Sequence, residues 1–231
     1  MVLMFSSDAV AFPTSGNPVG LPDGALKGTT TVGIVCRDGV VLATERRATL
    51  GGGFIANKVA QKLFKIDDHI GMTIAGWVGD AQALVRYLRA EVNLYRLRRA
   101  APISVEGSAT MLANILSGNR MMPYLAWVLI GGVDGKGIHL FSVDPAGGSI
   151  EDNFVSVGSG SAIAYGILEE AYKENLTVSE GLDIALRALT VAMKRDSNSG
   201  DGYLLSTITE KEYREYSDDE IKKRLTKLKL D

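Results

Sequence analysis

The sequence is poor in the residues that most often build metal and redox sites. Its 231 residues include one cysteine, Cys36, and two histidines, His69 and His139. A single cysteine excludes an internal disulfide and a multi-cysteine metal site, and it suits a reducing compartment, so we expect a cytoplasmic protein. Two histidines far apart in the chain do not favour a zinc site. We therefore expect neither a metal nor a cofactor, and any catalytic base has to come from another residue type.

Long apolar runs and a strong net charge are also lacking. The longest apolar stretch covers residues 124–133, well short of the roughly 20 residues that a membrane helix needs. The first residues lack the basic and apolar regions of a secretory signal. A formal net charge of −2 provides no broad basic field for nucleic acid, and no glycine-rich phosphate-binding loop joins a strand to a helix. We expect a soluble protein that binds neither membranes nor nucleic acid.

The chain has enough apolar material for one sizeable domain, since 46% of its residues are hydrophobic. Residues 1–28 differ from the rest, because they are rich in proline and glycine and show no helical or strand periodicity. We interpret residues 1–28 as a leader, or propeptide, outside the fold and residues 29–231 as the single domain.

Hydrophobic periodicity alternates between strand and helix patterns along this domain. The expected strands cover residues 30–35, 40–47, 62–66, 70–75, 124–134, 137–144, 153–157 and 203–209. The expected helices cover residues 80–99, 104–117, 161–173 and 177–195, with a short one from residue 217. Capping boxes, Thr177 with Glu180 and Ser217 with Glu220, begin the last two. The arginines in the first helix are interpreted as a solvated or subunit-contacting face. This order predicts an α+β fold of antiparallel sheets with segregated helices.

The first two strands form a hairpin around Arg37-Asp38-Gly39, for which we considered two registers. A two-residue Asp38-Gly39 turn gives one register, and a three-residue loop gives the other. Only the three-residue loop places Thr31 opposite Glu45 and Thr29 opposite Arg47. The chemistry considered next favours that register.

The segment LKGTTTVGIV, residues 26–35, marks the change from leader to strand. If the leader is removed after Gly28, Thr29 becomes the new N-terminus and carries a hydroxyl and a free α-amine. An α-amine has a pKa of about 8, so at neutral pH it can accept the proton of its own residue's hydroxyl. An amide nitrogen cannot do so, and removal of the leader would therefore switch the site on. Gly28 suits this cleavage because the missing Cβ permits strained backbone and leaves its carbonyl open to attack.

A nucleophilic threonine also needs a nearby cation and a carboxylate that holds the cation. Glu45, Arg47 and Lys62 are the candidates. From the residues alone, a salt-bridged strand end is the preferred explanation of Glu45 and Arg47, and a solvated lysine is the usual outcome for Lys62.

Taken together, the motifs closely resemble a proteasome β subunit of the archaeal type, within the N-terminal nucleophile hydrolases. The resemblance covers nearly all of residues 28–231. Its six markers, in order, are GTTTVG at 28–33, DGVVLATERR at 38–47, KLFKI at 62–66, AGWVGDAQ at 75–82, GSGS at 158–161 and RDSNSG at 195–200. Two departures are the glutamate at position 45, where the family more often has aspartate, and a glycine run at 51–53 that is one residue longer.

This resemblance implies a four-layer α-β-β-α sandwich and a threonine peptidase. It implies that Thr29 is the nucleophile, supported by Glu45 and Lys62, and that Gly76 contributes an oxyanion-hole amide. The residues implied around the threonine amine are Ser159, Asp196 and Ser199. The residues implied in the substrate pocket are Ala48, Ala60, Phe64, Ile74, Val78 and Gln82, and this mostly apolar lining predicts cleavage after hydrophobic residues.

The resemblance also implies a barrel of stacked rings. Seven-membered β rings, homo- or hetero-oligomeric, would be capped by heptameric α rings and supplied with unfolded polypeptide by a regulatory ATPase. A structural β subunit that keeps its leader is the main alternative. An N-terminal nucleophile amidohydrolase for small amides and the bacterial two-component protease fit the motifs and the helix order less well.

Overall fold

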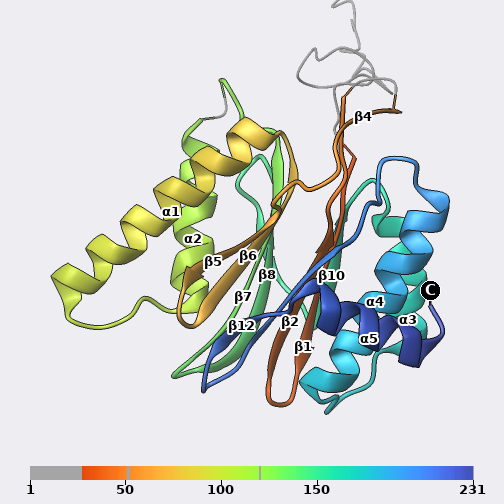
Figure 1. Ribbon diagram of the computed structural model, residues 1–231. Helices are drawn as coiled ribbons and strands as arrows, with labels where there is room; N and C mark the ends of the chain where they lie inside the picture. Colours follow the sequence, from red (N-terminus) through yellow and green to blue (C-terminus); the bar gives the residue numbers. More distant parts are fainter. Residues whose placement is uncertain (1–27, 51–52, 120, 231) are drawn as a thin grey trace, which may run out of the picture.

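The computed structural model describes residues 28–50, 53–119 and 121–230, and the following statements concern these residues. The predicted leader, apart from Gly28, lies outside them. Two five-stranded antiparallel sheets stack face to face, and helices cover the outer face of each (Figure 1). The predicted four-layer α-β-β-α sandwich is confirmed. No helix in these ranges is long and apolar enough to cross a bilayer.

The first sheet has the strand order β10-β1-β2-β11-β12. Its strands are β1 (Thr30–Cys36), β2 (Gly39–Glu45), β10 (Phe154–Gly158), β11 (Tyr203–Ile208) and β12 (Tyr213–Glu215). The two central strands, β1 and β2, are almost entirely buried. Both faces of these strands are covered, which explains why their sequences read as near-continuous apolar runs.

The second sheet has the strand order β5-β6-β7-β8-β9. Its strands are β5 (Leu63–Asp67), β6 (Ile70–Gly76), β7 (Ala126–Asp134), β8 (Gly137–Val143) and β9 (Ser149–Glu151). A separate two-stranded hairpin, β3 (Ala48–Leu50) with β4 (Phe54–Asn57), projects from one end of the sandwich (Figure 1). The sequence patterns did not predict β3, β4, β9 or β12, because three or four residues are too few to display a period.

Helices cover the outer faces in two groups. The helices α1 (Val78–Arg99) and α2 (Val105–Gly118) pack on the second sheet, and α3 (Ser161–Ala171), α4 (Val178–Arg195) and α5 (Asp218–Leu228) pack on the first. The predicted capping boxes are present at the starts of α4 and α5. All five predicted helices are thus confirmed to within a few residues at their ends, and the arginines of α1 are exposed.

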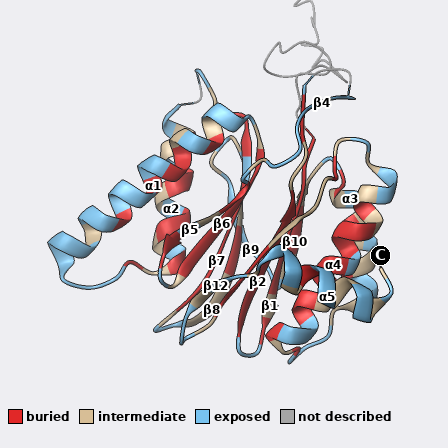
Figure 2. Cartoon of the chain, viewed as in Figure 1, coloured by how far each residue is buried: buried red, intermediate tan, exposed pale blue. Residues whose placement is uncertain are grey.

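Three apolar clusters fill the spaces between the four layers, and buried residues follow the facing surfaces in Figure 2. The middle cluster lies between the sheets and includes Leu42, Leu63, Leu129 and Leu140. Because these clusters pack each layer against the next, the ends of the central strands are fixed relative to one another. These strand ends carry the candidate site.

The predicted register of the first hairpin is wrong. Cys36 pairs with Gly39 and Thr31 pairs with Thr44, so the turn consists of Arg37 and Asp38 alone. Neither of the two registers considered from the sequence has this pairing. A Cβ at Gly39 would lie 2.3 Å from the carbonyl oxygen of Ile208 in the neighbouring strand, which explains why glycine belongs to the strand here. Glu45 therefore reaches the site from the end of β2, without a cross-strand pairing to Thr31.

Candidate active site

Thr29 lies immediately before the central strand β1 and is only 2% exposed. Its hydroxyl Oγ1 donates a hydrogen bond to the carbonyl oxygen of Gly28 at 2.7 Å. Its backbone nitrogen, still part of the peptide bond to Gly28, donates to Ser159 Oγ at 3.2 Å. The hydroxyl is therefore close to the carbonyl group of the residue that precedes it, as an intramolecular attack on that carbonyl requires.

Lys62 and Glu45 form a buried ion pair beside this threonine. Lys62, just before β5, is 8% exposed, and Glu45, the last residue of β2, is fully buried. The ammonium group of Lys62 donates to Glu45 Oε1 and to the backbone carbonyl of Arg47. The structure thus contradicts the solvated-lysine alternative. Lys62, Thr29 and Gly28 line the same pocket.

Backbone amides donate the remaining hydrogen bonds to the Glu45 carboxylate. Oε2 accepts hydrogen bonds from the amides of Arg47 at 2.5 Å and Gly200 at 3.0 Å, and Oε1 accepts one from the amide of Thr30 at 3.4 Å. A buried carboxylate with this many donors holds a fixed orientation. The extra methylene of glutamate, relative to the family's usual aspartate, is accommodated by these contacts.

Burial shifts the pKa values of both partners toward their neutral forms. Loss of water lowers the pKa of the Lys62 ammonium, against the opposing attraction of Glu45. Loss of water likewise raises the pKa of the Glu45 carboxyl, against its hydrogen bonds from Lys62 and the backbone. A lysine with a lowered pKa beside a hydroxyl can exchange a proton more readily than a solvated lysine can.

A chain of hydroxyl and carboxylate groups surrounds the nitrogen of Thr29 on the other side. Asp196, at the C-terminus of α4, accepts hydrogen bonds through Oδ2 from Ser159 Oγ at 2.5 Å and Ser199 Oγ at 2.6 Å. Ser199 Oγ also lies 2.7 Å from Thr30 Oγ1. The structure therefore brings Ser159, Asp196 and Ser199 together around Thr29, although they are far from it in the sequence. Such a network can relay a proton or orient the group that accepts it.

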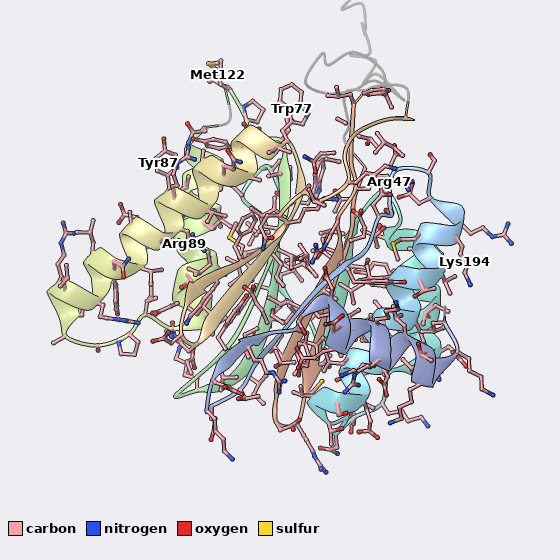
Figure 3. The ribbon with its side chains drawn as sticks, viewed as in Figure 1. Arg47, Trp77, Tyr87, Arg89, Met122 and Lys194 are labelled. Carbon is pink, nitrogen blue, oxygen red and sulfur yellow. The ribbon has the colours of Figure 1, made fainter. Side chains whose placement is uncertain are left out.

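Arg47 fastens the loop that carries Asp196 and Ser199 to the end of β2. Its guanidinium donates to Asp201 Oδ2 at 2.7 Å and to the carbonyl of Ser197 at 2.8 Å. A Cβ at Gly200 would lie 2.4 Å from this guanidinium. Arg47 thus holds the loop rather than providing the cation of the site. Figure 3 shows Arg47 and Trp77, the neighbour of Gly76, at the same end of the molecule.

Two glycines near Thr29 allow segments of backbone to approach one another closely. Gly158, at the end of β10, has a φ of +103°, and a Cβ there would lie 1.9 Å from the carbonyl oxygen of Thr29. Gly76, at the end of β6, has a φ of +145°, and a Cβ there would lie 2.0 Å from the carbonyl oxygen of Leu125. Only glycine fits both demands. Gly76 also lines the pocket at Thr29.

Much of the predicted substrate pocket surrounds Thr29. Among the predicted residues, Ala48, Ala60, Ile74 and Val78 line the pocket that contains Thr29 and Lys62. Gln61 and Ala81 also line it and were not predicted. Phe64 and Gln82 are not among its lining residues: Phe64 packs against the core beneath α1 and α2, and Gln82 is exposed.

Sequence reasoning missed three contributors: Thr30, Asp201 and Asn198. Thr30 was interpreted as strand material only, yet its hydroxyl joins the Ser199 network. Asn198 and Asp201 lie in the loop after α4; the Arg-Asp-Ser-Asn-Ser-Gly motif at 195–200 includes Asn198, and Asp201 follows it directly. Their partners, Arg47 and Gly28, come from distant parts of the chain, so no spacing in the sequence could reveal these contacts.

Comparison with known proteins places these observations in a family. Residues 25–208 match the family model described as proteasome subunit. A protein named proteasome subunit beta from Methanothermobacter thermautotrophicus is 54% identical over 204 residues, which cover 88% of this chain and 97% of that relative. Proteins of the same name from Ferroglobus placidus and Methanohalophilus mahii are 52% and 53% identical over 208 residues, or 90% of this chain and 99% of each relative.

Proposed function

We propose that this chain, which belongs to the proteasome subunit family as a β subunit, is a catalytic subunit of a 20S core particle and acts as an N-terminal threonine endopeptidase. One observation carries the proposal: the Thr29 hydroxyl lies 2.7 Å from the carbonyl oxygen of Gly28, in a pocket that also contains the buried ammonium of Lys62. The nucleophile, the carbonyl it would attack and a cation to stabilise the developing oxyanion are thus together in the uncut chain.

The chain would first process itself between Gly28 and Thr29. Thr29 Oγ1 attacks the carbonyl carbon of Gly28 and gives up its proton to the surrounding network. Collapse of the tetrahedral intermediate breaks the bond from the Gly28 carbon to the Thr29 nitrogen, which takes up a proton and becomes an amine. The resulting ester joins Gly28 to Thr29 Oγ1. Water hydrolyses this ester, releases the leader as a carboxylic acid and frees the Thr29 hydroxyl.

The mature site would repeat this chemistry on other polypeptides. The free amine of Thr29 has an ordinary pKa of about 8 and accepts the hydroxyl proton as the oxygen attacks a peptide carbonyl. The amine stays beside Ser159, which Asp196 orients. Lys62, held by Glu45, stabilises the negative oxygen, and the amide of Gly76 is our candidate oxyanion-hole donor. Proton transfer to the leaving amine and hydrolysis of the ester by water complete the cycle.

We propose a preference for cleavage after hydrophobic residues. The pocket at Thr29 contains the apolar side chains of Ala48, Ala60, Ile74 and Val78. Such a lining favours an apolar side chain and offers a carboxylate or guanidinium no buried partner of opposite charge, apart from the already paired Lys62. Peptide substrates ending in leucine or tyrosine should therefore be cleaved faster than those ending in glutamate or arginine, and equal rates would contradict this preference.

The relatives' name, proteasome subunit beta, supports assembly with other subunits. We propose that the chain forms heptameric β rings, alone or with a second β subunit, stacked in pairs and capped by heptameric α rings. A regulatory ATPase would deliver unfolded polypeptides to this cytoplasmic particle. Enclosure would serve the chemistry, because a site with a broad preference has to be kept away from folded proteins.

Peptide hydrolysis by the particle assembled with α subunits tests the function. We expect Thr29→Ala to abolish turnover of a leucine-ending fluorogenic peptide without preventing assembly. Thr29→Ser keeps the hydroxyl and the amine and serves as the matched control, which should retain measurable turnover. If Thr29→Ala cleaves the peptide as fast as the parent, the proposal is wrong. An assembled parent that is inactive and keeps its leader would instead indicate the alternative, a structural β subunit.

A further inference from the structure

The space around Gly28 is occupied by a side chain from the loop after α4. A Cβ on Gly28 would lie 1.8 Å from Asn198 Cβ and 2.5 Å from Asn198 Cγ. Non-bonded carbon atoms are normally about 3.5–4.0 Å apart, so an alanine at position 28 cannot coexist with Asn198 in this arrangement. Gly28 itself is buried.

Asn198 cannot easily move away from this position. Its backbone N–H donates to Asp196 Oδ1 at 3.1 Å. The preceding backbone carbonyl, that of Ser197, accepts a hydrogen bond from Arg47. The following residue, Ser199, is fully buried in the hydrogen-bond network around Thr29. A shift of the loop to make room would therefore disturb the groups that position the Thr29 nitrogen.

Gly28 is held from its other sides as well. Its amide donates to Thr49 Oγ1 at 3.4 Å, and its carbonyl accepts from Thr29 Oγ1. A side chain on residue 28 would push the residue away from Asn198, and this movement would also displace the carbonyl that Thr29 attacks. A displacement of about 1 Å in an intramolecular attack reduces the rate by about 100-fold.

We infer that Asn198 is the specificity-determining residue for self-cleavage, because its side chain reserves position 28 for glycine. This inference rests on the proposed function, since it presumes that the bond between Gly28 and Thr29 is cut by Thr29. Asn198 is a positioning residue: it occupies the space beside Gly28 and thereby excludes a side chain on residue 28.

The Cβ of Asn198 matters more than its amide group. A Cβ on residue 28 would also lie 2.8 Å from Ser159 Oγ, but a hydroxyl can turn aside by rotation about χ1. The Cβ of Asn198 is fixed to the backbone and cannot turn aside. Asn198→Ala therefore keeps the closest obstructing atom, whereas Asn198→Gly removes it. These two variants distinguish the steric role from any role of the carboxamide.

The test measures the penalty for Gly28→Ala in three backgrounds: the parent, Asn198→Ala and Asn198→Gly. Each full-length chain is assembled with α subunits, and intact mass spectrometry follows the conversion to a chain beginning at Thr29. We expect Gly28→Ala to slow conversion by about 100-fold in the parent and in Asn198→Ala. In Asn198→Gly the penalty should fall to about 10-fold or less, because the closest of the clashing atoms is then absent. Each penalty is measured against the Gly28 chain of the same background, which removes any general effect of the loop variant.

Equal penalties in all three backgrounds would overturn the inference, as would a rescue by Asn198→Ala as large as that by Asn198→Gly. An Asn198→Gly chain that cannot process an intact Gly28 would also overturn it, since residue 198 would then have a role besides filling space. A parent chain that assembles and keeps its leader contradicts the proposed function and this inference together. A parent that processes normally, with no difference between the backgrounds, contradicts this inference alone.

Discussion

The ion pair of Lys62 and Glu45 is the most costly arrangement in the site at the scale of single residues. Transfer of two charges from water into a protein interior costs several kcal/mol per ion, and their attraction and hydrogen bonds only partly offset this cost. Packed apolar residues would give the fold equal or greater stability. Lys62 of this pair lines the same pocket as Thr29, so we propose catalysis rather than stability as the reason for its burial.

We predict that Lys62→Met removes most peptidase activity. Methionine fills a similar volume without a charge, so the developing oxyanion loses its cation and the rate should fall by about 100-fold or more. Lys65→Met is the matched control, because Lys65 lies in β5, shortly after Lys62, but is exposed and pairs with Asp68 at the surface. Peptide turnover by assembled particles measures both. A Lys62→Met particle as active as Lys65→Met would contradict the role.

Asp201 gives a prediction about pH. The hydrogen bond from Arg47 lowers the pKa of the Asp201 carboxyl below its ordinary value of about 4. A lowered pKa in the folded state means that the ionised form stabilises the fold above the ordinary pKa, and that this contribution is lost as the pH falls through the lowered value. Asp201→Asn removes the charge and tolerates the left-handed φ of +63° at this position.

We expect Asp201→Asn to reduce the free energy of unfolding of the isolated chain by about 0.5–1 kcal/mol at pH 7, because the pair is partly exposed. The difference from the parent should shrink as the pH falls below about 4, where Asp201 itself becomes protonated. Urea unfolding curves between pH 7 and pH 3 measure it. A difference that stays constant over this range would show that the charge is not its cause.

Residue roles could be predicted from the sequence only in part. Thr29, Glu45 and Lys62 were proposed as site residues because motifs of a known family carry them, since local chemistry alone favoured a salt-bridged strand end and a solvated lysine. The burial of Lys62 depends on the meeting of β2, β5 and the loop after α4, which no local pattern encodes. The same holds for Asn198, whose partner Gly28 is at the other end of the chain.

Helix starts are the best-predicted features at the scale of secondary-structure elements. Thr177 and Glu180 at α4, and Ser217 and Glu220 at α5, form complete capping boxes in which side chains satisfy the first amides. All the groups involved lie within three residues, so sequence alone suffices to predict them. The hairpin register depends instead on Ile208 in β11, which approaches Gly39 from a distant part of the chain, and sequence reasoning therefore failed there.

The two capping boxes allow a matched prediction. Thr177→Ala and Ser217→Ala remove the same type of hydrogen bond, and each should weaken its helix start by about 1 kcal/mol. Helix α4 packs against β1 and β2 with many fully buried residues, whereas α5 buries only Ile221. We therefore expect Thr177→Ala to lower the urea midpoint of the whole chain, and Ser217→Ala mainly to speed hydrogen exchange within α5. Equal effects of the two variants on the urea midpoint would contradict this difference.

At the scale of the whole molecule, three apolar clusters pack the helices and the two sheets against one another. This packing fixes the positions of the strand ends that carry the site. Cys36 lies in the apolar cluster between α4 and the first sheet, so its reactivity depends on how closely these two layers pack. Cys36 is 3% exposed, and burial, with the nearby carboxylates of Asp38 and Glu180, raises the pKa of its thiol to about 12. A Cβ at Gly181 in α4 would lie 2.6 Å from its sulfur, so the contact between the helix and the sheet is close.

We predict that Cys36 does not react with a thiol reagent such as dithionitrobenzoate at pH 8 while the chain is folded, because the thiolate is scarce and the reagent has no access. Unfolding in guanidinium should release one reactive thiol per chain, which is the control. Fast reaction of the folded chain would mean that α4 separates readily from the first sheet.

The sequence and length of the mature chain test the central claim most directly, because self-cleavage requires the nucleophile, the carbonyl and the supporting groups to act together. The measurement is intact mass with N-terminal sequencing of the chain after assembly with α subunits. The account predicts a chain that begins at Thr29 in the parent and retains residues 1–28 in Thr29→Ala. An assembled parent chain that still begins at Met1 would contradict it.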